Sequence, residues 1–203
     1  GAWADAAHEQ SQGDAGGAQP RSLYHGFRIF ELARTDASVV TFYTAQAGLF
    51  RTACRLGGTP EQFAEWDPKI RSFEMTGVFS LTEPDHGSDI AGGLATAARR
   101  EGDEWVIDGA KRWIGGAFTA DYLAVFARDV ADGQVKGFLV DREAPGVQLT
   151  KIRGKTALRM MQNADIELTG VRVPEAQRLG NVNSFKDVAA MLRVMRSDVS
   201  WIA

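Results

Sequence analysis

Cysteine and histidine are scarce: the 203 residues hold one cysteine, Cys54, and three histidines. A single cysteine excludes an internal disulfide framework and is typical of a reducing compartment. The histidines lie far apart in the sequence and give no recognisable zinc-binding spacing, so no metal site is predicted. No apolar run approaches the roughly 18 residues of a membrane-spanning helix, so we expect no membrane span.

The sequence also lacks an excess of charge of one sign. It has 23 basic and 26 acidic residues, which leaves a formal net charge of −3. This near-neutral balance gives no reason to expect a nucleic-acid partner. The hydrophobic fraction of 44% and the charged fraction of 24% are typical of a globular protein.

The first part of the chain divides into an arm and a helical region. Residues 1–20 are rich in Gly, Ala, Gln and Asp without apolar periodicity, so we expect a disordered arm or sequence foreign to the domain. Residues 21–75 carry apolar side chains at mostly three- to four-residue steps, which predicts helices. Thr59-Pro60-Glu61-Gln62 forms a capping box with proline at the first helical position, which predicts a helix from Pro60 to about Ser72.

Residues 76–180 change to short β-type runs separated by glycine-containing turns. This spacing predicts an antiparallel barrel or sandwich. Asp108-Gly109 is typical of a tight hairpin turn. The predicted strands are 78–81, 94–97, 105–107, 112–114, 122–126, 138–140, 147–149, 166–168 and 171–173.

Residues 181–203 return to a helical period, with Ser184 as the expected N-cap. The apolar stripe consists of Val188, Met191, Leu192, Met195, Val199 and Ile202. Because the stripe runs to the last residue and needs a partner surface, we expect the chain to stop inside a larger architecture. The predicted fold class is α+β: an N-terminal helical piece, an antiparallel barrel-like middle domain, and the start of a C-terminal helical bundle that is cut short.

Two stretches contain candidate functional residues. The first, 79–89, is a strand end followed by a Glu-Pro step and a loop with Gly, Ser and two Asp. Such a loop can bind a polar ligand edge or a phosphate, and it equally fits an ordinary turn with local side-chain hydrogen bonds. The second places Trp113 before Gly115-Gly116, which permits a flat ring to approach the backbone, although a core tryptophan also fits. No GxGxxG opens a helix after a strand, so a Rossmann site is unsupported.

Taken together, the motifs resemble the acyl-CoA dehydrogenase family over about residues 30–203. The resemblance is nearest to the branch with glutaryl-CoA dehydrogenases and the short-chain acyl-CoA oxidases of plants. It is carried by six segments in order: LTEPDHGSD, DGAKRWIGG, ADYLAVFAR, GFLV with APGV, KIRGKTALR and VRVPEAQRL.

The resemblance implies FAD as cofactor, bound between the middle β domain and the C-terminal bundle, in a homotetramer. The residues implied to bind the cofactor are Phe79, Leu81, Thr82, Gly87, Ser88, Trp113, Ile114 and Gly115. Those implied to contact the acyl-CoA substrate are Ser88, Val40 and Thr41.

The implied reaction is α,β-dehydrogenation of an acyl-CoA thioester to a trans-2-enoyl-CoA, with electron-transfer flavoprotein or oxygen as acceptor. The family's catalytic glutamate lies on the C-terminal bundle, so we expect no catalytic residue within this chain; Glu83 and Glu104 are not substitutes. The expected location is the cytoplasm, or mitochondria or peroxisomes in a eukaryote.

The chain departs from the family pattern at two places that bear on function. Gly115 and Gly116 replace the usual Thr and Asn after Trp-Ile, so a hydroxyl contact to the flavin is absent. Val40 stands where glutaryl enzymes carry an arginine, and a buried carboxylate without a cation is costly, which disfavours a dicarboxyl substrate.

Two alternatives to a dehydrogenase stay open. An acyl-CoA oxidase performs the same substrate chemistry and passes electrons to oxygen. A non-catalytic fragment or remnant of the family could fold and associate with other subunits without turnover.

Overall fold

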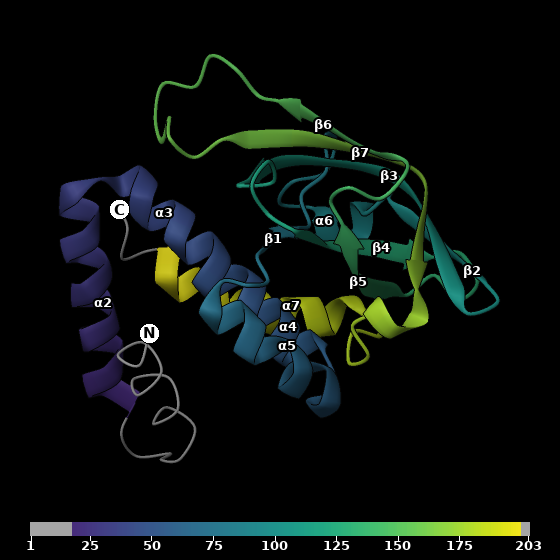
Figure 1. Ribbon diagram of the computed structural model, residues 1–203, viewed down its shortest axis with the longest axis horizontal. Helices are drawn as coiled ribbons and strands as arrows, with labels where there is room; N and C mark the ends of the chain where they lie inside the picture. The colour runs from purple at the N-terminus through teal and green to yellow at the C-terminus, as the bar shows by residue number, and fades with distance from the viewer. Residues whose placement is uncertain (1–17, 200–203) are drawn as a thin grey trace.

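A computed structural model describes residues 18–199 as helices packed against a curled, mixed seven-stranded sheet (Figure 1). This confirms the predicted α+β class. Residues 1–17 of the expected arm lie outside the described residues, whereas residues 18–20 already form the first turn of a helix. Proline is tolerated in a first helical turn, and Pro20 therefore does not prevent this earlier start.

The helical elements lie mainly before the sheet in the sequence. They are α2 (Ala18–Thr35), α3 (Ala37–Thr44), the π-helix η2 (Ala45–Phe50), α4 (Arg51–Gly57), α5 (Pro60–Ser72), α6 (Ile90–Gly93), the 3-10 helix η3 (Glu175–Gln177) and α7 (Phe185–Val199). The segments α3, η2 and α4 follow one another as one rod, with α5 and α7 beside it under the sheet (Figure 1).

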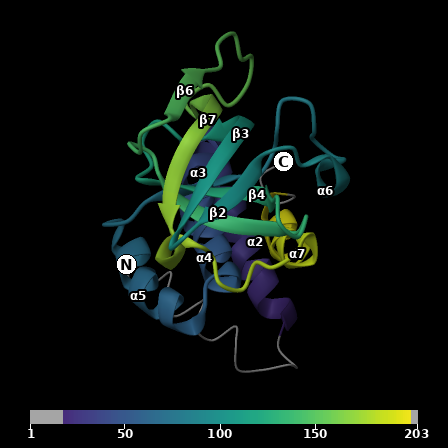
Figure 2. The ribbon, with the colours of Figure 1, turned by 90° about the vertical axis from the view of Figure 1, so that its right-hand side faces the viewer.

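The strands are β1 (Gly77–Ser80), β2 (Ala97–Glu101), β3 (Glu104–Gly115), β4 (Tyr122–Asp129), β5 (Val135–Asp141), β6 (Val147–Lys151) and β7 (Asn163–Pro174). Their order is β1-β4-β2-β3-β7-β6, with β5 also paired to β4. The long strands β3 and β7 lie side by side (Figure 2).

The sheet is mixed, and the expectation of a purely antiparallel one is wrong in this respect. Both β1 and β2 pair with β4 in parallel. Parallel neighbours require a crossover connection rather than a tight hairpin, and both strands are separated from β4 by long segments of chain.

Asp108-Gly109 is not a hairpin turn, because both residues lie inside the continuous strand β3 at a shift of its register with β7. Gly109 has φ 152°, and a Cβ there would lie 2.6 Å from the Thr96 hydroxyl. The Asp108 carboxylate accepts a hydrogen bond from Gly170 N at 2.7 Å. The Asp-Gly pair thus forms an irregularity that bends the strand.

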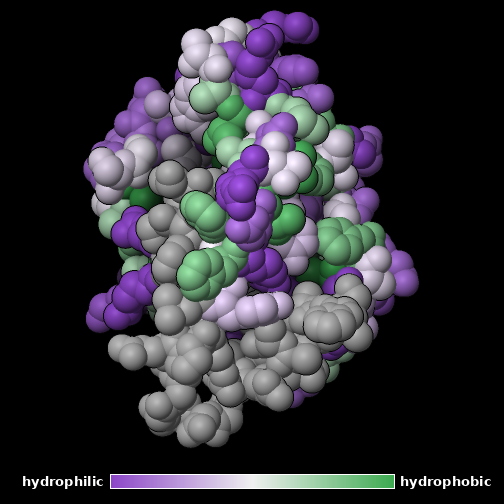
Figure 3. Space-filling model, turned by 90° about the vertical axis from the view of Figure 1, so that its left-hand side faces the viewer, coloured by the Kyte–Doolittle hydropathy of each residue, from purple (hydrophilic) through white to green (hydrophobic). Residues whose placement is uncertain are grey.

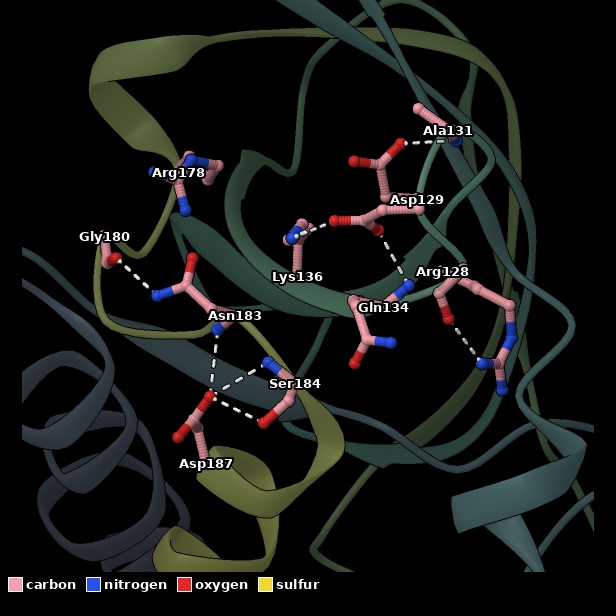
Figure 4. Close-up of polar contacts among 12 residues, drawn as sticks. Arg128, Asp129, Ala131, Gln134, Lys136, Arg178, Gly180, Asn183, Ser184 and Asp187 are labelled. Carbon is pink, nitrogen blue, oxygen red and sulfur yellow. Dashed lines mark hydrogen bonds and ion pairs between the residues drawn. The ribbon is translucent and has the colours of Figure 1, made fainter.

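Two helices begin as the sequence predicts. The Thr59 hydroxyl accepts from Gln62 N, and the Gln62 side chain accepts from Thr59 N, which completes the capping box of α5. At the start of α7, the Asp187 carboxylate accepts from both Ser184 N and Ser184 Oγ (Figure 4). On the predicted stripe of α7, Val188, Met191 and Met195 are buried, whereas Ile202 lies outside the described residues.

Two hydrophobic clusters fill the interior, one between the helices and the sheet and one inside the curl of the sheet. Phe50 and the buried Cys54 belong to the first cluster. The π-helix brings Gln46 inward, where its side-chain oxygen accepts from Gly77 N at 2.7 Å. This bond ties the helical rod to the first residue of β1. No helix among residues 18–199 has the length and apolar character needed to cross a membrane.

The packing at Gly77 predicts a large effect of one added methyl group. In Gly77→Ala the new Cβ would lie 2.1 Å from a ring carbon of Phe50, which is completely buried. We expect a loss of about 1–3 kcal/mol in the free energy of unfolding, measured with urea. The matched control is Gly92→Ala, where a Cβ meets nothing within 4 Å. Equal stability of the two variants would contradict this packing.

Candidate functional site

The two candidate stretches lie next to each other at one end of the sheet. Arg112 N donates a hydrogen bond to Thr82 O at 2.8 Å, directly after the end of β1 and directly before Trp113. Although β1 and β3 are not sheet neighbours, this contact places Thr82 beside the residue that precedes Trp113. The resemblance implies that both segments line one flavin ring, and the structure does place them next to each other, whereas contact with a flavin stays a prediction.

Trp113 is turned outward by a bulge in β3. The register between β3 and β7 shifts between Lys111 and Ile114, so that Arg112 and Trp113 together oppose Asp165. Trp113 has φ 63°, the left-handed region that a bulky residue rarely adopts, and its side chain is 51% exposed. Such strain persists only where surrounding contacts hold it, and it is concentrated at functional sites. Trp113 is therefore a surface ring and not the core tryptophan that local sequence also allowed.

A buried ion pair lies behind this surface. Lys111 Nζ donates to Glu83 Oε1 at 2.8 Å, to Phe126 O at 2.7 Å and to Leu81 O at 3.3 Å, so all three ammonium donors are used. The Lys111 side chain is fully buried and that of Glu83 is 3% exposed. One ammonium group thus joins β3, β4, the end of β1 and the loop that follows it.

The Glu83 carboxylate is also saturated with donors. It accepts from Ala95 N at 2.7 Å, from Thr96 N at 3.0 Å and from the Thr96 hydroxyl. Burial raises the pKa of Glu83, but the Lys111 charge and these hydrogen bonds outweigh burial and leave the pKa below its usual value. Burial lowers the pKa of Lys111 to about 8, against the opposing effect of Glu83. A carboxylate so engaged is a structural group, as expected for this Glu-Pro step.

The loop beyond Glu83 is held by a second, exposed pair. The His86 ring lies 2.8 Å from an Asp89 carboxylate oxygen, and this hydrogen bond raises the pKa of the imidazole. The same ring packs on Gly93, where a Cβ would lie 2.1 Å from Nδ1. Gly87 and Ser88, at the tip of the loop, are exposed and accessible to a ligand.

The remaining predicted cofactor residues differ in what they expose. The side chains of Leu81 and Ile114 are buried in the two clusters, so any ligand contact there is through the backbone. Phe79 is half-buried, with its ring centroid 4.8 Å from that of Phe126. Thr82 and Gly115 are half-buried as well.

Met161 explains the glycine that replaces the family's threonine. A Cβ at Gly115 would lie 2.9 Å from the sulfur of Met161, which is buried. Gly116 has φ 82°, the left-handed region that favours glycine, and faces Phe42 of α3. The space of the missing side chain is therefore already filled, and a hydroxyl at residue 115 would not fit without a shift of Met161.

The two predicted substrate residues on α3 are placed differently from each other. Val40 has no exposed surface, whereas Thr41 is half-buried and its hydroxyl donates to Ala37 O at 2.6 Å. Contact of either residue with an acyl chain stays a prediction, and only Thr41 is accessible without movement. The face that carries α2 and α3 shows hydrophobic side chains among polar ones (Figure 3). Its exposed apolar residues include Val39 and Phe42 of α3.

Sequence reasoning missed two residues whose contacts hold the candidate site together, Lys111 and Asn163. A lysine within a strand normally indicates a solvated edge. Lys111 and Ile114 are both buried although they are three residues apart, which simple alternation along a strand does not allow. The bulge between them produces this spacing, and it was not recognised in the sequence. Asn163 Nδ2 donates to Trp113 O at 2.9 Å across 50 residues of sequence, a contact that no local pattern indicates.

Comparison with known proteins identifies relatives of this chain. Residues 78–171 match the family model described as acyl-CoA dehydrogenase, middle domain. The chain is 34% identical over 161 residues to the short-chain specific acyl-CoA dehydrogenase, mitochondrial, of Bos taurus; the match covers 78% of this chain and 39% of that protein.

Solved structures of enzymes with related names also resemble this chain. A glutaryl-CoA dehydrogenase from Mycobacterium smegmatis is 34% identical, with a TM-score of 0.82 over 89% of this chain and 46% of its own. A structure of a glutaryl-CoA dehydrogenase from the same organism in complex with FADH2 has 31% identity and a TM-score of 0.81, with the same coverage. The chain thus spans less than half the length of each of these relatives.

The buried pair predicts a strong effect of removing one partner. We expect Lys111→Met to lower the free energy of unfolding by about 3–5 kcal/mol, because Glu83 is left as an unpaired buried charge. Glu83→Gln/Lys111→Met should be less destabilised than Lys111→Met alone. Lys69→Met removes a pair in which both side chains are at least half exposed, and should change stability by about 1 kcal/mol or less. A Lys111→Met protein as stable as Lys69→Met would exclude the pair as a structural centre.

Proposed function

Because this chain belongs to the acyl-CoA dehydrogenase family, we propose that it forms the flavin-binding wall of an enzyme that oxidises an acyl-CoA thioester to a trans-2-enoyl-CoA. The observation that carries the proposal is the hydrogen bond of 2.8 Å between Arg112 N and Thr82 O. It joins the loop with the exposed Gly87 and Ser88 to the strand with the exposed Trp113, so that a phosphate-binding and a ring-binding element share one surface.

The residues present fit FAD. The half-exposed indole of Trp113 offers a flat apolar surface on which part of a flavin ring can stack, and the backbone of the nearby Gly115 is only half-buried. The space beside Gly87 is open, since a Cβ there would meet nothing within 4 Å. Asp89, which follows this tip, forms an ion pair with His86, so its negative charge is partly compensated.

The proposed roles of the chain's own residues are positional. Thr82 and Trp113 would hold the flavin ring, Gly87 and Ser88 would hold the pyrophosphate, and Ser88 would also contact the acyl-CoA. Helix α3, with Thr41, closes the acyl side and excludes water. FAD would supply an acceptor for the hydride that leaves the substrate β-carbon, and the α-proton would go to the glutamate that the family carries on its C-terminal bundle. Holding substrate and acceptor in register removes the entropic cost of their encounter.

Further features of the proposed enzyme follow from the family resemblance. We propose a homotetramer that passes electrons to electron-transfer flavoprotein or to oxygen. In a eukaryote it would reside in mitochondria, as the name of the bovine relative states for that protein, or in peroxisomes; in a bacterium it would reside in the cytoplasm. Rapid hydrogen peroxide formation with acyl-CoA in air distinguishes an oxidase from a dehydrogenase.

The flavin site is tested by titration of the protein with FAD. We expect Trp113→Ala to raise the FAD dissociation constant about tenfold, because the ring loses its flat apolar contact. Val130→Ala truncates another exposed apolar side chain, 61% exposed at the β4–β5 turn, and should bind FAD as the unchanged protein does. Equal affinity of both variants, or no FAD binding by the unchanged full-length protein, would reject the proposed site.

The substrate class is tested with the full-length, FAD-loaded enzyme on butyryl-CoA and glutaryl-CoA. We expect kcat/KM to be at least about tenfold higher for butyryl-CoA, because Val40 provides no cation and an unpaired buried carboxylate is costly. An artificial electron acceptor and peroxide formation are scored in parallel, so that the identity of the acceptor does not affect the comparison. A preference for glutaryl-CoA would overturn the argument from Val40.

A further inference from the structure

Two strained residues far apart in the sequence share one hydrogen-bond network. Outside glycine, positive φ occurs in the described part of the chain at Phe73, Trp113 and Leu158. The carbonyls of Trp113 and Leu158 are both bound by neighbouring side chains, those of Asn163 and Lys155. The segment with Lys155 and Leu158 connects β6 to β7 and extends beyond the sheet (Figure 1).

Lys155 organises this connection. Its ammonium group donates to Leu158 O at 2.9 Å, to Met161 O at 2.5 Å and to Asn163 Oδ1 at 2.5 Å. An ammonium has three donors, and all three are used here. Burial lowers the pKa of Lys155, in keeping with a half-buried group rather than a solvated charge. Lys155 is therefore engaged within the loop, unlike a free basic residue that awaits an anion.

Asn163 transmits this order to Trp113. It is the first residue of β7 and pairs with Gly115 across the sheet. Its Oδ1 accepts from Lys155, and its Nδ2 donates to Trp113 O at 2.9 Å. One amide side chain thus links the loop to the bulge that turns the indole outward.

Burial does not account for the order of this loop. Leu158 and Met160 are 39% and 63% exposed, and only Met161 among its apolar side chains is buried. Polar contacts therefore contribute much of the order of the loop. Gln162 O accepts from Gly116 N at 2.9 Å, and Asn163, at the end of the loop, binds the carbonyl of the strained Trp113. Arg112 adds a second restraint, with its guanidinium carbon 5.6 Å from the ring centroid of Trp113.

We propose that Asn163 and Lys155 are positioning residues that set the Trp113 ring against the bound flavin. Asn163 holds the Trp113 carbonyl, and with it the left-handed backbone from which the indole projects. Lys155 fixes which way the Asn163 amide faces, because an ammonium binds only the amide oxygen and leaves the NH2 group for Trp113. The part of this inference that concerns flavin rests on the proposed function. The restraint that Asn163 and Lys155 place on Trp113 does not depend on a bound flavin.

The test uses a variant that separates the two bonds of Asn163. Asn163→Asp keeps an oxygen for Lys155 but loses the donor to Trp113 O. Asn163→Leu removes both bonds without adding a charge, and Lys155→Met removes the support behind Asn163. Asn181→Asp is the matched control, because Asn181 Nδ2 also donates to a backbone carbonyl, that of Gly58, at 2.6 Å near the helices.

The readout is 19F NMR of protein labelled with 5-fluorotryptophan, with and without FAD, alongside FAD titration and thermal unfolding. The chain has five tryptophans, and the Trp113 resonance is assigned with Trp113→Phe. We expect all three test variants to shift the Trp113 resonance while that of Trp66 stays in place. The FAD dissociation constant should rise about tenfold, the order expected when a bonded carbonyl loses its partner. Asn181→Asp should change neither quantity.

Two results would overturn the proposal. In the first, Asn163→Asp and Asn163→Leu leave the Trp113 resonance in place and keep the FAD dissociation constant within twofold of that of the unchanged protein. The other is a displacement of the Trp66 resonance equal to that of Trp113, which would indicate a general loss of structure. A normal Trp113 resonance in Lys155→Met alone would overturn the part assigned to Lys155. If the unchanged full-length protein binds no FAD, the proposed function fails, and the resonance in the free protein still decides whether Asn163 and Lys155 hold Trp113.

Discussion

The buried contact between Lys111 and Glu83 is the interaction on which the rest of the site depends. Two side chains with almost no exposed surface meet at 2.8 Å. Lys111 also donates to a carbonyl inside β4, and Glu83 also accepts from the backbone before β2 and from the Thr96 hydroxyl. Removing charged groups from water is costly, so the pair is maintained only because every donor and acceptor is satisfied. The consequence is that the end of β1, the loop after it and the middle of β3 have one fixed arrangement.

Trp113 depends on this arrangement from one side and on β7 from the other. Arg112 N binds Thr82 O, and Asn163 binds the Trp113 carbonyl, so the strained residue is held between two hydrogen bonds from different elements. The bulge that results exposes a large ring at the edge of a buried sheet, where β-bulges commonly redirect side chains. A rigid, exposed aromatic surface beside a loop with accessible Gly87 and Ser88 suits a cofactor with both a flat ring and phosphates.

Much of the fold follows from local sequence rules, and the site does so only in part. The capping box at Thr59 predicted the first residue of α5, and the spacing of Val188, Met191 and Met195 predicted the buried face of α7. The same rules failed at Asp108-Gly109, because pairing with β7 overrides the turn preference of the dipeptide. Parallel pairing of β1 and β2 with β4 depends on tertiary contacts that no short window of sequence contains.

The site shows the same division between local pattern and long-range contact. Motifs marked Thr82 and Trp113 as candidates, but the roles of Lys111 and Asn163 arise from contacts that span 28 and 50 residues. Lys111 and Asn163 have polar side chains, which sequence alone would place at the surface. Their partners become visible only when the strands are paired.

The most direct test of the account is a crystal structure of the protein with FAD bound. The account predicts the flavin ring against Trp113 and the Thr82 segment, with the phosphates near Gly87 and Ser88 and the Lys111–Glu83 contact unchanged behind them. A flavin bound at any other surface, or a site in which Thr82 and Trp113 have separated, would contradict it.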